Sequence, residues 1–367
     1  MDLVLYALFG TVFVLSIYYI FIFRKFPFLK HYPIGFNNSK VSVIICVKNE
    51  AENLSHNLPY ILSQNCSGFE IVLINDGSSD STLEVMQRFK KKHDNIKIID
   101  VEPLETFWGN KKFALTLGIK AAAYNRLLFT DADCKPLSNH WIDKMCSGLS
   151  TEKDLVLGYS PYKKVRGSFL NKLIRFETFM TALQYMSYAA IGKPYMAVGR
   201  NLAYNKDLFF KANGFVKHMQ LKSGDDDLFV NQVGNANNTF LQIDPNSFVE
   251  SLPKTNLQAW ILQKRRHIST SSFYKLEHQV MLALYYISQL IFYFSTIFLM
   301  SLGYLWKIVL TIVLLKFIIQ YFIFYKPAKT LRENDLLILL PVLEILLIIF
   351  QLSIFILNLI SKPKHWK

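Results

Sequence analysis

The chain opens with a long apolar run that carries no charge, and this run limits the folds that are possible. Residues 3–23 contain no Asp, Glu, Lys or Arg. As a helix they would be about 30 Å long, which is enough to cross the hydrocarbon core of a bilayer. A cleaved signal peptide carries positive charge before its apolar run, whereas here Asp2 precedes the run and Arg24 and Lys25 follow it. We therefore expect a transmembrane helix over residues 1–24 and a cytoplasmic location for the residues that follow.

Further apolar runs lie near the C-terminus. They cover approximately residues 279–302, 304–325 and 335–360. These runs help to raise the hydrophobic share of the chain to 51% and its mean hydropathy to +0.22, which excludes a disordered chain and argues against an ordinary soluble protein. We expect transmembrane helices over 279–361. Lys316 and Glu344 lie inside these runs, and because an isolated charge at that depth is costly, we expect them to pair inside the helix bundle.

The last apolar run leaves the number of membrane crossings open. With a cytoplasmic middle segment, three C-terminal crossings would place Lys362, Lys364 and Lys367 outside, which the positive-inside rule disfavours. A final segment that re-enters at Pro341 would return this tail to the cytoplasm. The sequence therefore predicts three or four transmembrane segments in all.

The net charge indicates which binding partners to expect, and the cysteines indicate the redox state of the cellular compartment. Lys and Arg number 41 against 27 Asp and Glu, which gives a net charge of +14. Such an excess is typical of chains that meet a membrane surface, nucleic acid or phosphorylated ligands, and of these we expect membrane lipids and phosphorylated ligands but no nucleic acid. The cysteines form no C-x-x-C pattern, which argues against a disulfide scaffold or a zinc site and favours a reducing compartment. They are Cys46, Cys66, Cys134 and Cys146.

The middle of the chain, residues 38–255, alternates strand and helix patterns. Short β-branched runs predict strands over 41–47, 69–75, 95–101 and 126–130. Helical patterns extend to about residue 64 after the first strand, begin at Ser81 after the second and cover 111–123 after the third. This order predicts an α/β fold with a mostly parallel sheet and helices on both faces. Ligands of such sheets bind beyond the carboxyl ends of the strands.

Acidic residues follow three of these strands. They are Glu50, Asp76, and the pair Asp131 and Asp133. Any one of them could be a turn residue or a helix cap, but carboxylates that meet at one sheet edge repel one another, and a cation would relieve this repulsion. The spacing of Asp131 and Asp133 suits Mg²⁺ or Mn²⁺. The chain contains no EF-hand loop, no P-loop lysine motif and no G-x-G-x-x-G.

Three later segments each allow two interpretations. The acids Asp225–Asp227 could form a solvated turn, or one of them could be a desolvated base with a raised pKa. The basic run at Gln263–His267 could anchor an interfacial segment, residues 256–278, to anionic lipid headgroups, or it could clamp a diphosphate. The stretch 168–188 has apolar residues at helical spacing beside basic residues, so we expect an amphipathic helix on the cytoplasmic headgroups, with packing against the sheet as the alternative.

Taken in order, these motifs resemble the family-2 inverting glycosyltransferases with a GT-A fold, and most closely the membrane branch with cellulose, hyaluronan and poly-N-acetylglucosamine synthases and ceramide glucosyltransferase. The resemblance covers approximately residues 38–275. It rests on VSVIICVKNEAENL, INDGSSDST, GNKKFALTLGI, LLFTDADC, VGRNLAY, SGDDDLFVNQ and QKRRH. It implies a GT-A nucleotide-sugar-binding domain with transmembrane helices at both ends.

The resemblance also implies roles for the residues that bind the donor. Glu50 and Asp76 would contact the uridine of a nucleotide-sugar, and Lys112 would lie near its base or phosphates. Asp131 and Asp133 would hold a divalent metal, Mg²⁺ or Mn²⁺, and with it the diphosphate.

The base and the basic clamp follow from the same resemblance. Asp226 would be the general base if the motif is aligned on Gly224 and Asn231, while alignment on Asp227–Leu228 selects Asp225. Gln263 and Arg266 match a Q-x-x-R-W pattern that covers the diphosphate and the acceptor. His267 stands where the pattern has Trp, and imidazole covers less area than indole.

The implied function is that of a membrane-bound, metal-dependent inverting glycosyltransferase. It would move a sugar from a nucleotide-diphosphate donor, with UDP as the expected nucleotide, to a glycan or lipid hydroxyl and form a β-glycosidic bond. Such an enzyme would act in cell-envelope polysaccharide or glycolipid synthesis, as an integral protein of the plasma (inner) membrane with a cytoplasmic catalytic domain. A polyprenyl-phosphate sugar transferase is one alternative. A non-catalytic membrane assembly subunit is another, and the charges at Lys316 and Glu344 leave a transporter as a third.

Overall fold

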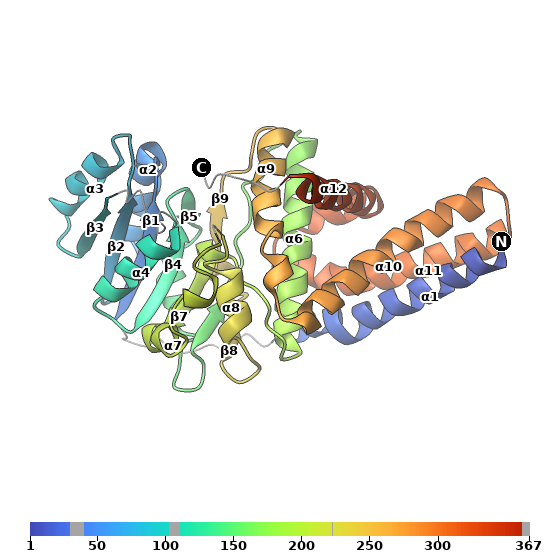
Figure 1. The fold of residues 1–367 in the computed structure, drawn as a ribbon, viewed down its shortest axis with the longest axis horizontal. Coiled ribbons are helices and arrows are strands. Elements are labelled where there is room, and N and C mark those ends of the chain that lie inside the picture. The colour runs from blue at the N-terminus through green and yellow to red at the C-terminus, as the bar shows by residue number, and fades with distance from the viewer. Residues whose placement is uncertain (30–39, 103–110, 222, 362–367) are drawn as a thin grey trace. The chain divides into compact units, whose positions relative to one another are not determined.

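The computed structural model describes residues 1–29, 40–102, 111–221 and 223–361, and these form two compact units (Figure 1). The sheet unit consists of the described parts of Lys30–Lys164 and Pro194–Lys254. The helical unit consists of Met1–Leu29, Val165–Lys193 and the described part of Thr255–Pro363. The two units are described separately below.

The sheet unit contains a seven-stranded mixed sheet in the order β3-β2-β1-β4-β7-β6-β8. Its strands are β1 Val41–Val47, β2 Phe69–Asp76, β3 Ile96–Val101, β4 Arg126–Asp131, β6 Leu155–Leu157, β7 Leu202–Asn205 and β8 Thr239–Leu241. The first four strands are parallel to one another, which confirms the predicted βαβα half of the sheet. β7 runs antiparallel to both β4 and β6. A separate two-stranded sheet pairs β5 Cys134–Pro136 with β9 Val249–Ser251.

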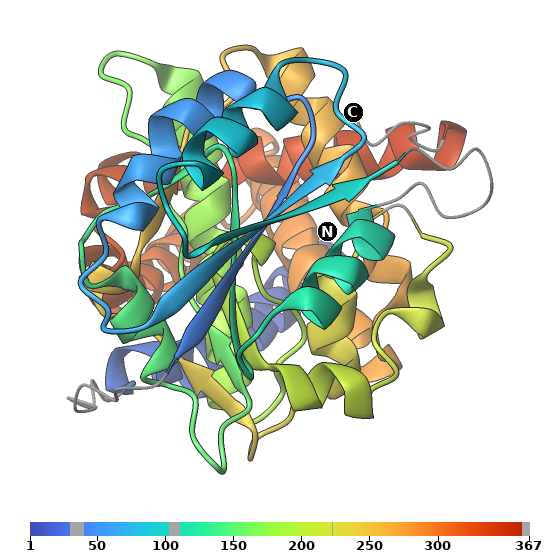
Figure 2. The same cartoon turned by 90° about the vertical axis from the view of Figure 1, so that its left-hand side faces the viewer.

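Helices cover both faces of the sheet, as Figure 2 shows. They are α2 Ala51–Leu62, α3 Thr82–Lys90, α4 Lys111–Ala121, α5 Trp141–Cys146, α7 Lys206–Lys211 and α8 Asp227–Val233. Alternate residues of the buried strand β1 serve the two faces. Val43 and Ile45 belong to the core under α2, α3 and α5, whereas Ile44 and Cys46 line a pocket with Leu115 of α4. Gly118 lets α4 approach closely, because a Cβ there would lie 2.2 Å from Ile74 Cδ1.

Within its described residues, the helical unit contains four helical segments that are long and apolar enough to cross a membrane. These are Asp2–Phe28, Leu276–Ser301, Trp306–Thr330 and Asn334–Ile360. The first combines α1 Asp2–Ile17 with a π-helical turn Tyr18–Ile22 and a 3₁₀ turn Phe23–Phe28. The others contain α10 Leu276–Ser301, α11 Trp306–Thr330 and α12 Leu340–Ile360, and the unit also holds α6 Phe169–Ala190 and α9 Leu257–Ile268.

Pro341 does not break the last apolar run. It stands in the first turn of α12, where a missing backbone N–H costs no helical hydrogen bond. From there α12 continues without interruption to Ile360. The tail residues Lys362, Lys364 and Lys367, on which the topology argument depended, lie outside the described residues.

The predicted pair inside the bundle is confirmed. Lys316 Nζ of α11 lies 2.5 Å from Glu344 Oε2 of α12, and both side chains are almost fully buried. Gln320 donates to Glu344 Oε1 at 2.7 Å and accepts from Lys316 at 2.7 Å. Gln289 and Tyr293 of α10 donate to the same carboxylate. The network therefore joins all three C-terminal helices.

The expected interfacial helix at 168–188 is not a surface helix. α6 packs against the 3₁₀ turn Phe23–Phe28 and against α12, and buried residues occur on all its sides. The prediction failed because its charged residues form internal ion pairs. Arg175 donates to Glu333 and Asp335, and Glu177 Oε2 lies 2.5 Å from Lys264 Nζ.

Candidate active site

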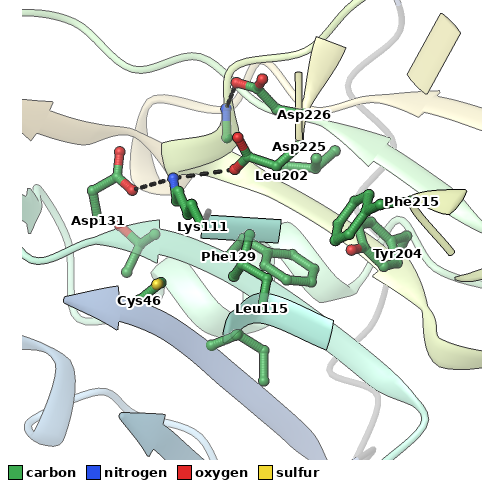
Figure 3. Close-up of a pocket in the computed structure, with 13 residues that line it drawn as sticks. Cys46, Lys111, Leu115, Phe129, Asp131, Leu202, Tyr204, Phe215, Asp225 and Asp226 are labelled. Atoms are coloured by element: carbon green, nitrogen blue, oxygen red, sulfur yellow. Dashed lines mark hydrogen bonds and ion pairs between the residues drawn. The ribbon is translucent and has the colours of Figure 1, made fainter. Parts of the chain in front are cut away.

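A pocket opens at the carboxyl ends of β1 and β4, on the face of the sheet that α4 covers (Figure 3). Its charged lining consists of Lys111, Asp131, Asp225 and Asp226. Asp131 is the last residue of β4, Lys111 begins α4, and the other two acids precede α8. The fold thus brings together acids that are almost one hundred residues apart in the sequence.

Lys111 links two of these acids. Its Nζ lies 3.3 Å from Asp131 Oδ1 and 3.1 Å from Asp225 Oδ2, and Figure 3 shows the ammonium between the two carboxylates. Burial acts to raise the pKa of Asp225, but the Lys111 charge and hydrogen bond lower it below its ordinary value overall. Asp225 therefore stays ionised as the partner of Lys111.

Asp226 has a different environment from its neighbour. Its Oδ2 accepts a hydrogen bond from the Gly199 N–H at 2.6 Å, and its Oδ1 accepts one from the Asp227 N–H at 2.8 Å. Burial, followed by the charges of Asp225 and Asp227, raises the pKa of Asp226 to about 7. A carboxylate with a pKa near neutrality can accept a proton from a substrate and release it again.

Asp131 and Asp133, for which the sequence predicts a metal site, lie close together in the structure. Ligand atoms of Asp131, Asp133 and Cys134 all lie within 4.8 Å of one another. Burial, and next the charge of Asp131, raise the pKa of Asp133, so the folded protein disfavours the charged form of Asp133. Burial also raises the pKa of the Cys134 thiol well above its ordinary value, which leaves two hard oxygen donors. This donor set fits Mg²⁺ or Mn²⁺.

Glu50 immediately precedes α2 and Asp76 is the last residue of β2, and hydrogen bonds link the segments that follow β1 and β2. The Ser79 N–H donates to Asn49 Oδ1 at 2.8 Å, and the Glu50 N–H donates to Thr82 Oγ1 at 3.0 Å. Asp76 is buried, and this burial raises its pKa. Neither acid is among the described residues that line the pocket around Lys111, so their contact with a uridine stays a prediction.

The structure places Lys111 in the pocket, whereas the sequence analysis selected Lys112. Lys112 Nζ donates to the carbonyls of His218, Leu221 and Ser223 at 2.6–2.9 Å, and burial lowers its pKa to about 8. Adjacent residues of a helix point about 100° apart, so only one of two neighbouring lysines can face the site. Helical spacing could have identified it, because Lys111 lies four residues before Leu115, which lines the same pocket.

Gln263, Arg266 and His267 lie on α9, which belongs to the helical unit. Lys264 and Arg265, which lie between Gln263 and Arg266, anchor α9 to other helices of the helical unit. Lys264 pairs with Glu177, and Arg265 donates to Asn358 Oδ1 at 2.9 Å and to Ser361 Oγ at 2.8 Å, near the end of α12. Trp260 of α9 also stacks on Phe350 of α12 with centroids 3.8 Å apart. The roles of Gln263, Arg266 and His267 towards a diphosphate stay predictions.

Comparison with known protein families finds a match over part of the chain. Residues 42–211 match the family model described as Glycosyl transferase family 2. The domain that residues 42–211 cover belongs to glycosyltransferase family 2. The matched segment of the family-2 domain includes β1 to β4, the acid pair Asp131 and Asp133, and the Gly199–Asn201 turn that holds Asp226.

Two curated proteins are similar to parts of the chain. Poly-beta-1,6-N-acetyl-D-glucosamine synthase of Staphylococcus epidermidis is 38% identical over 136 residues, which is 36% of this chain and 32% of that protein. Glycosyltransferase AglE of Haloferax volcanii is 31% identical over 188 residues, which is 50% of this chain and 58% of that protein. The match thus spans about a third of the synthase and less than two thirds of AglE.

A solved structure shares the fold. The mannosyltransferase PcManGT from Pyrobaculum calidifontis, determined in complex with GDP-Man and Mn²⁺, aligns with a TM-score of 0.58 at 16% identity. The alignment covers 94% of this chain and 97% of that one. It confirms the predicted fold class, a GT-A domain accompanied by apolar helices.

Proposed function

We propose that the chain is a membrane-bound inverting glycosyltransferase that moves a sugar from a nucleotide-diphosphate donor, with UDP as the expected nucleotide, to a hydroxyl of a glycan or lipid. The observation that carries this proposal is the convergence of Lys111, Asp131, Asp225 and Asp226 in one pocket at the carboxyl ends of the parallel strands. The product would be a β-glycoside in cell-envelope polysaccharide or glycolipid synthesis.

The proposed chemistry assigns the proton to Asp226. The acceptor hydroxyl attacks the anomeric carbon from the face opposite the nucleotide, the bond from this carbon to the phosphate oxygen breaks, and the hydroxyl proton moves to the Asp226 carboxylate. One base is enough for inversion, because no covalent sugar–enzyme intermediate forms. The Gly199 and Asp227 N–H groups fix the carboxylate for this transfer. Because Asp225 is engaged with Lys111, we favour Asp226 over Asp225 as the base.

Asp131 and Asp133 would hold the Mg²⁺ or Mn²⁺ ion. When bound, the ion would neutralise charge that develops on the departing diphosphate. Lys111 contributes a second positive charge beside Asp131. In this proposal Glu50 and Asp76 bind the base or ribose of the nucleotide, and Gln263, Arg266 and His267 cover the diphosphate and the acceptor.

The proposed membrane arrangement has a helix over residues 1–24, a cytoplasmic glycosyltransferase domain over 38–255, an interfacial basic segment over 256–278 and C-terminal transmembrane helices over 279–361. The four long apolar helical segments support it. A polyprenyl phosphate is the alternative acceptor, and the basic residues of α9 would suit that ligand as well.

The test is a donor screen on the full-length protein in detergent or nanodiscs. UDP-glucose, UDP-N-acetylglucosamine and GDP-mannose are each supplied with Mn²⁺, and the released nucleoside diphosphate is measured. We expect release from at least one donor and loss of release with excess EDTA. Asp131→Ala should be inactive, while Asp94→Asn, at an exposed position on the loop before β3, should match wild type. If none of the donors gives metal-dependent release, the proposed function is wrong.

The same screen addresses the acceptor. An active donor is incubated with membrane lipid extract, and mass spectrometry identifies the lipid or glycan that gains the mass of one sugar. Gain on a hydroxyl supports the proposal, and gain on a polyprenyl phosphate supports the alternative acceptor.

A further inference from the structure

Arg200 lies in the middle of a rigid turn beside the candidate active site. The turn Gly199–Asn201 leads into β7, and its first residue holds Asp226 through the Gly199 N–H. Its last residue is fully buried, and Asn201 Nδ2 donates to the Tyr159 and Ser247 carbonyls at 2.7 and 2.9 Å. Arg200 therefore extends from backbone that is fixed on both sides.

One edge of the Arg200 guanidinium donates hydrogen bonds to Ser160, whereas its Nη1 atom makes one long contact in the part of the chain that the structure describes. Nε donates to Ser160 Oγ at 2.7 Å, and Nη2 donates to the Ser160 carbonyl at 3.1 Å. The guanidinium also lies 4.7 Å from the centre of the Tyr162 ring. Among the described residues, Nη1 has one partner, the Tyr162 hydroxyl at 3.5 Å, and this is too long for a strong hydrogen bond.

Contacts around Arg200 place it beside the acid pair. Tyr162 forms a β-bridge with Ser251, Ser251 Oγ lies 3.4 Å from Cys134 Sγ, and this thiol contacts Asp133 Oδ1 at 3.3 Å. Burial works against the charge of Arg200, but Tyr162 and Cys134, followed by Asp133 and Asp131, raise the pKa of its guanidinium overall. A permanent positive charge therefore stands near these two carboxylates.

We propose that Arg200 binds a phosphate oxygen of the substrate at the Asp131–Asp133 side of the pocket. A guanidinium presents N–H donors in a planar fork that matches phosphate oxygens, and the Nη1 edge has donors to offer. A divalent ion on Asp131 and Asp133 would balance these two carboxylates, so Arg200 adds net positive charge for an anionic substrate. The inference rests on the proposed function and adds a residue to it.

The phosphate could belong to the nucleotide donor or to a phosphorylated acceptor, and two binding measurements distinguish these sources. In the first, isothermal titration calorimetry measures UDP and GDP, each with Mn²⁺, on full-length wild type and on Arg200→Gln. Loss of a charge-assisted hydrogen bond should weaken the nucleotide that binds by about 10- to 100-fold. Arg200→Lys, which keeps the charge but loses the fork, should lie between the two. This result assigns Arg200 to the donor diphosphate.

In the second measurement the protein is saturated with UDP or GDP and Mn²⁺, and farnesyl phosphate is compared with farnesol. If Arg200 binds the acceptor phosphate, Arg200→Gln leaves nucleotide affinity unchanged, weakens farnesyl phosphate by about 10- to 100-fold and leaves farnesol unaffected. Arg126→Gln is the matched control, because Arg126 is half-buried at the opposite end of β4, and it should bind every ligand as wild type does.

The outcomes separate the possible failures. If wild type binds UDP or GDP with Mn²⁺ and Arg200→Gln binds all phosphates equally well, the Arg200 proposal is overturned while the proposed function stands. It is also overturned if Arg200→Gln weakens uridine or guanosine as much as the diphosphates and lowers the melting temperature, because Arg200 then serves only the fold. If wild type binds neither nucleotide, the proposed function itself fails.

Discussion

Two clusters of lysine and carboxylate, one in each unit, show how the same residue types serve different purposes. In the helical unit the Glu344 carboxylate accepts hydrogen bonds from Lys316, Gln320, Gln289 and Tyr293. Side chains of α10 and α11 thus satisfy both oxygens of this α12 residue, and the cluster needs no ligand. A fully connected polar network of this kind specifies how helices pack.

The cluster of the sheet unit is not balanced in this way. Lys111 bridges Asp131 and Asp225, but Asp133 and Asp226 remain nearby with raised pKa values. A raised carboxyl pKa means that the folded protein disfavours the charged form. The comparison indicates that surplus negative charge, rather than the mere presence of buried charge, distinguishes the cluster that we propose to bind a cation and a substrate. This difference predicts that removing an acid has opposite effects on protein stability in the two clusters.

The largest expected effect is on the metal pair. Asp131→Ala and Asp133→Ala should each reduce glycosyl transfer below detection, because the departing diphosphate would lose its neutralising ion. Each substitution removes one of two carboxylates that lie close together, so the melting temperature should stay within a few degrees of wild type. Activity is measured by nucleoside diphosphate release and stability by thermal unfolding, with Asp94→Asn as the control. Full activity in excess EDTA would show that this pair does not bind an essential metal.

The next effect concerns the base. Asp226→Asn should lower the turnover rate by about 10²–10⁴-fold, the usual range for loss of a general base, while nucleotide affinity changes little. In wild type the rate should rise with pH up to about 7, because the carboxyl must lose its proton to act. If Asp225→Asn shows this pattern and Asp226→Asn is near wild type, the assignment is wrong by one residue.

Although Asp226→Asn should lower the turnover rate, it should raise the stability of the protein. Since the folded-state pKa is raised to about 7, the contribution of this carboxyl to the free energy of unfolding falls as pH rises from about 4 to about 7. Asp226→Asn removes this penalty and should stabilise the metal-free protein at pH 8, by at most about 4 kcal/mol. Chemical denaturation at pH 5 and pH 8 measures it. A loss of stability at pH 8 would contradict the view that this site carries surplus negative charge.

In the cluster of the helical unit, removing a charged residue should instead lower the stability of the protein. Lys316→Met or Glu344→Gln leaves a buried partner uncompensated and should each destabilise the protein by about 3 kcal/mol. The double variant should lose less than the sum of the two, because it leaves no lone charge. Unfolding of the detergent-solubilised protein supplies the double-mutant cycle. Strictly additive losses would mean that the two residues do not interact.

Sequence reasoning identified the parts of this molecule that local pattern determines. The parallel strands β1 to β4 are apolar runs of six to eight residues, so their positions could be predicted from the local sequence. The strands β6, β7 and β8 have only three or four residues each and depend on pairing with distant segments, which no local pattern reveals. The pair Lys316 and Glu344 was predictable because an isolated charge in an apolar run must find a partner.

The candidate site was predicted in composition but not in detail. Spacing at strand ends identified Asp131 and Asp133, whereas the choice between Lys111 and Lys112 depends on the rotation of α4. The nature of α6 was missed for a related reason. Its basic residues suggested a helix on lipid headgroups, but Arg175 pairs with Glu333 and Asp335, which are far away in the sequence.

The smallest expected effect is at Gly199, and it tests how precisely the Asp226 carboxylate must be positioned. A Cβ at this residue would lie 3.0 Å from Asp226 Oδ2 and 3.2 Å from Asp226 Cβ, so Gly199→Ala must displace the proposed base by a few tenths of an ångström. The turn should persist, because this glycine has no positive φ. We expect turnover to fall about 10-fold, since small displacements of a reacting group are costly, with the free energy of unfolding changed by less than about 1 kcal/mol. Gly167→Ala is the control: its Cβ would meet nothing within 4 Å, but its φ of +78° makes the substitution strained, so it should lower stability and spare turnover. If both variants lose stability and keep full turnover, the Gly199 N–H does not position a catalytic carboxylate, and Asp226 belongs with Glu344 among the structural acids.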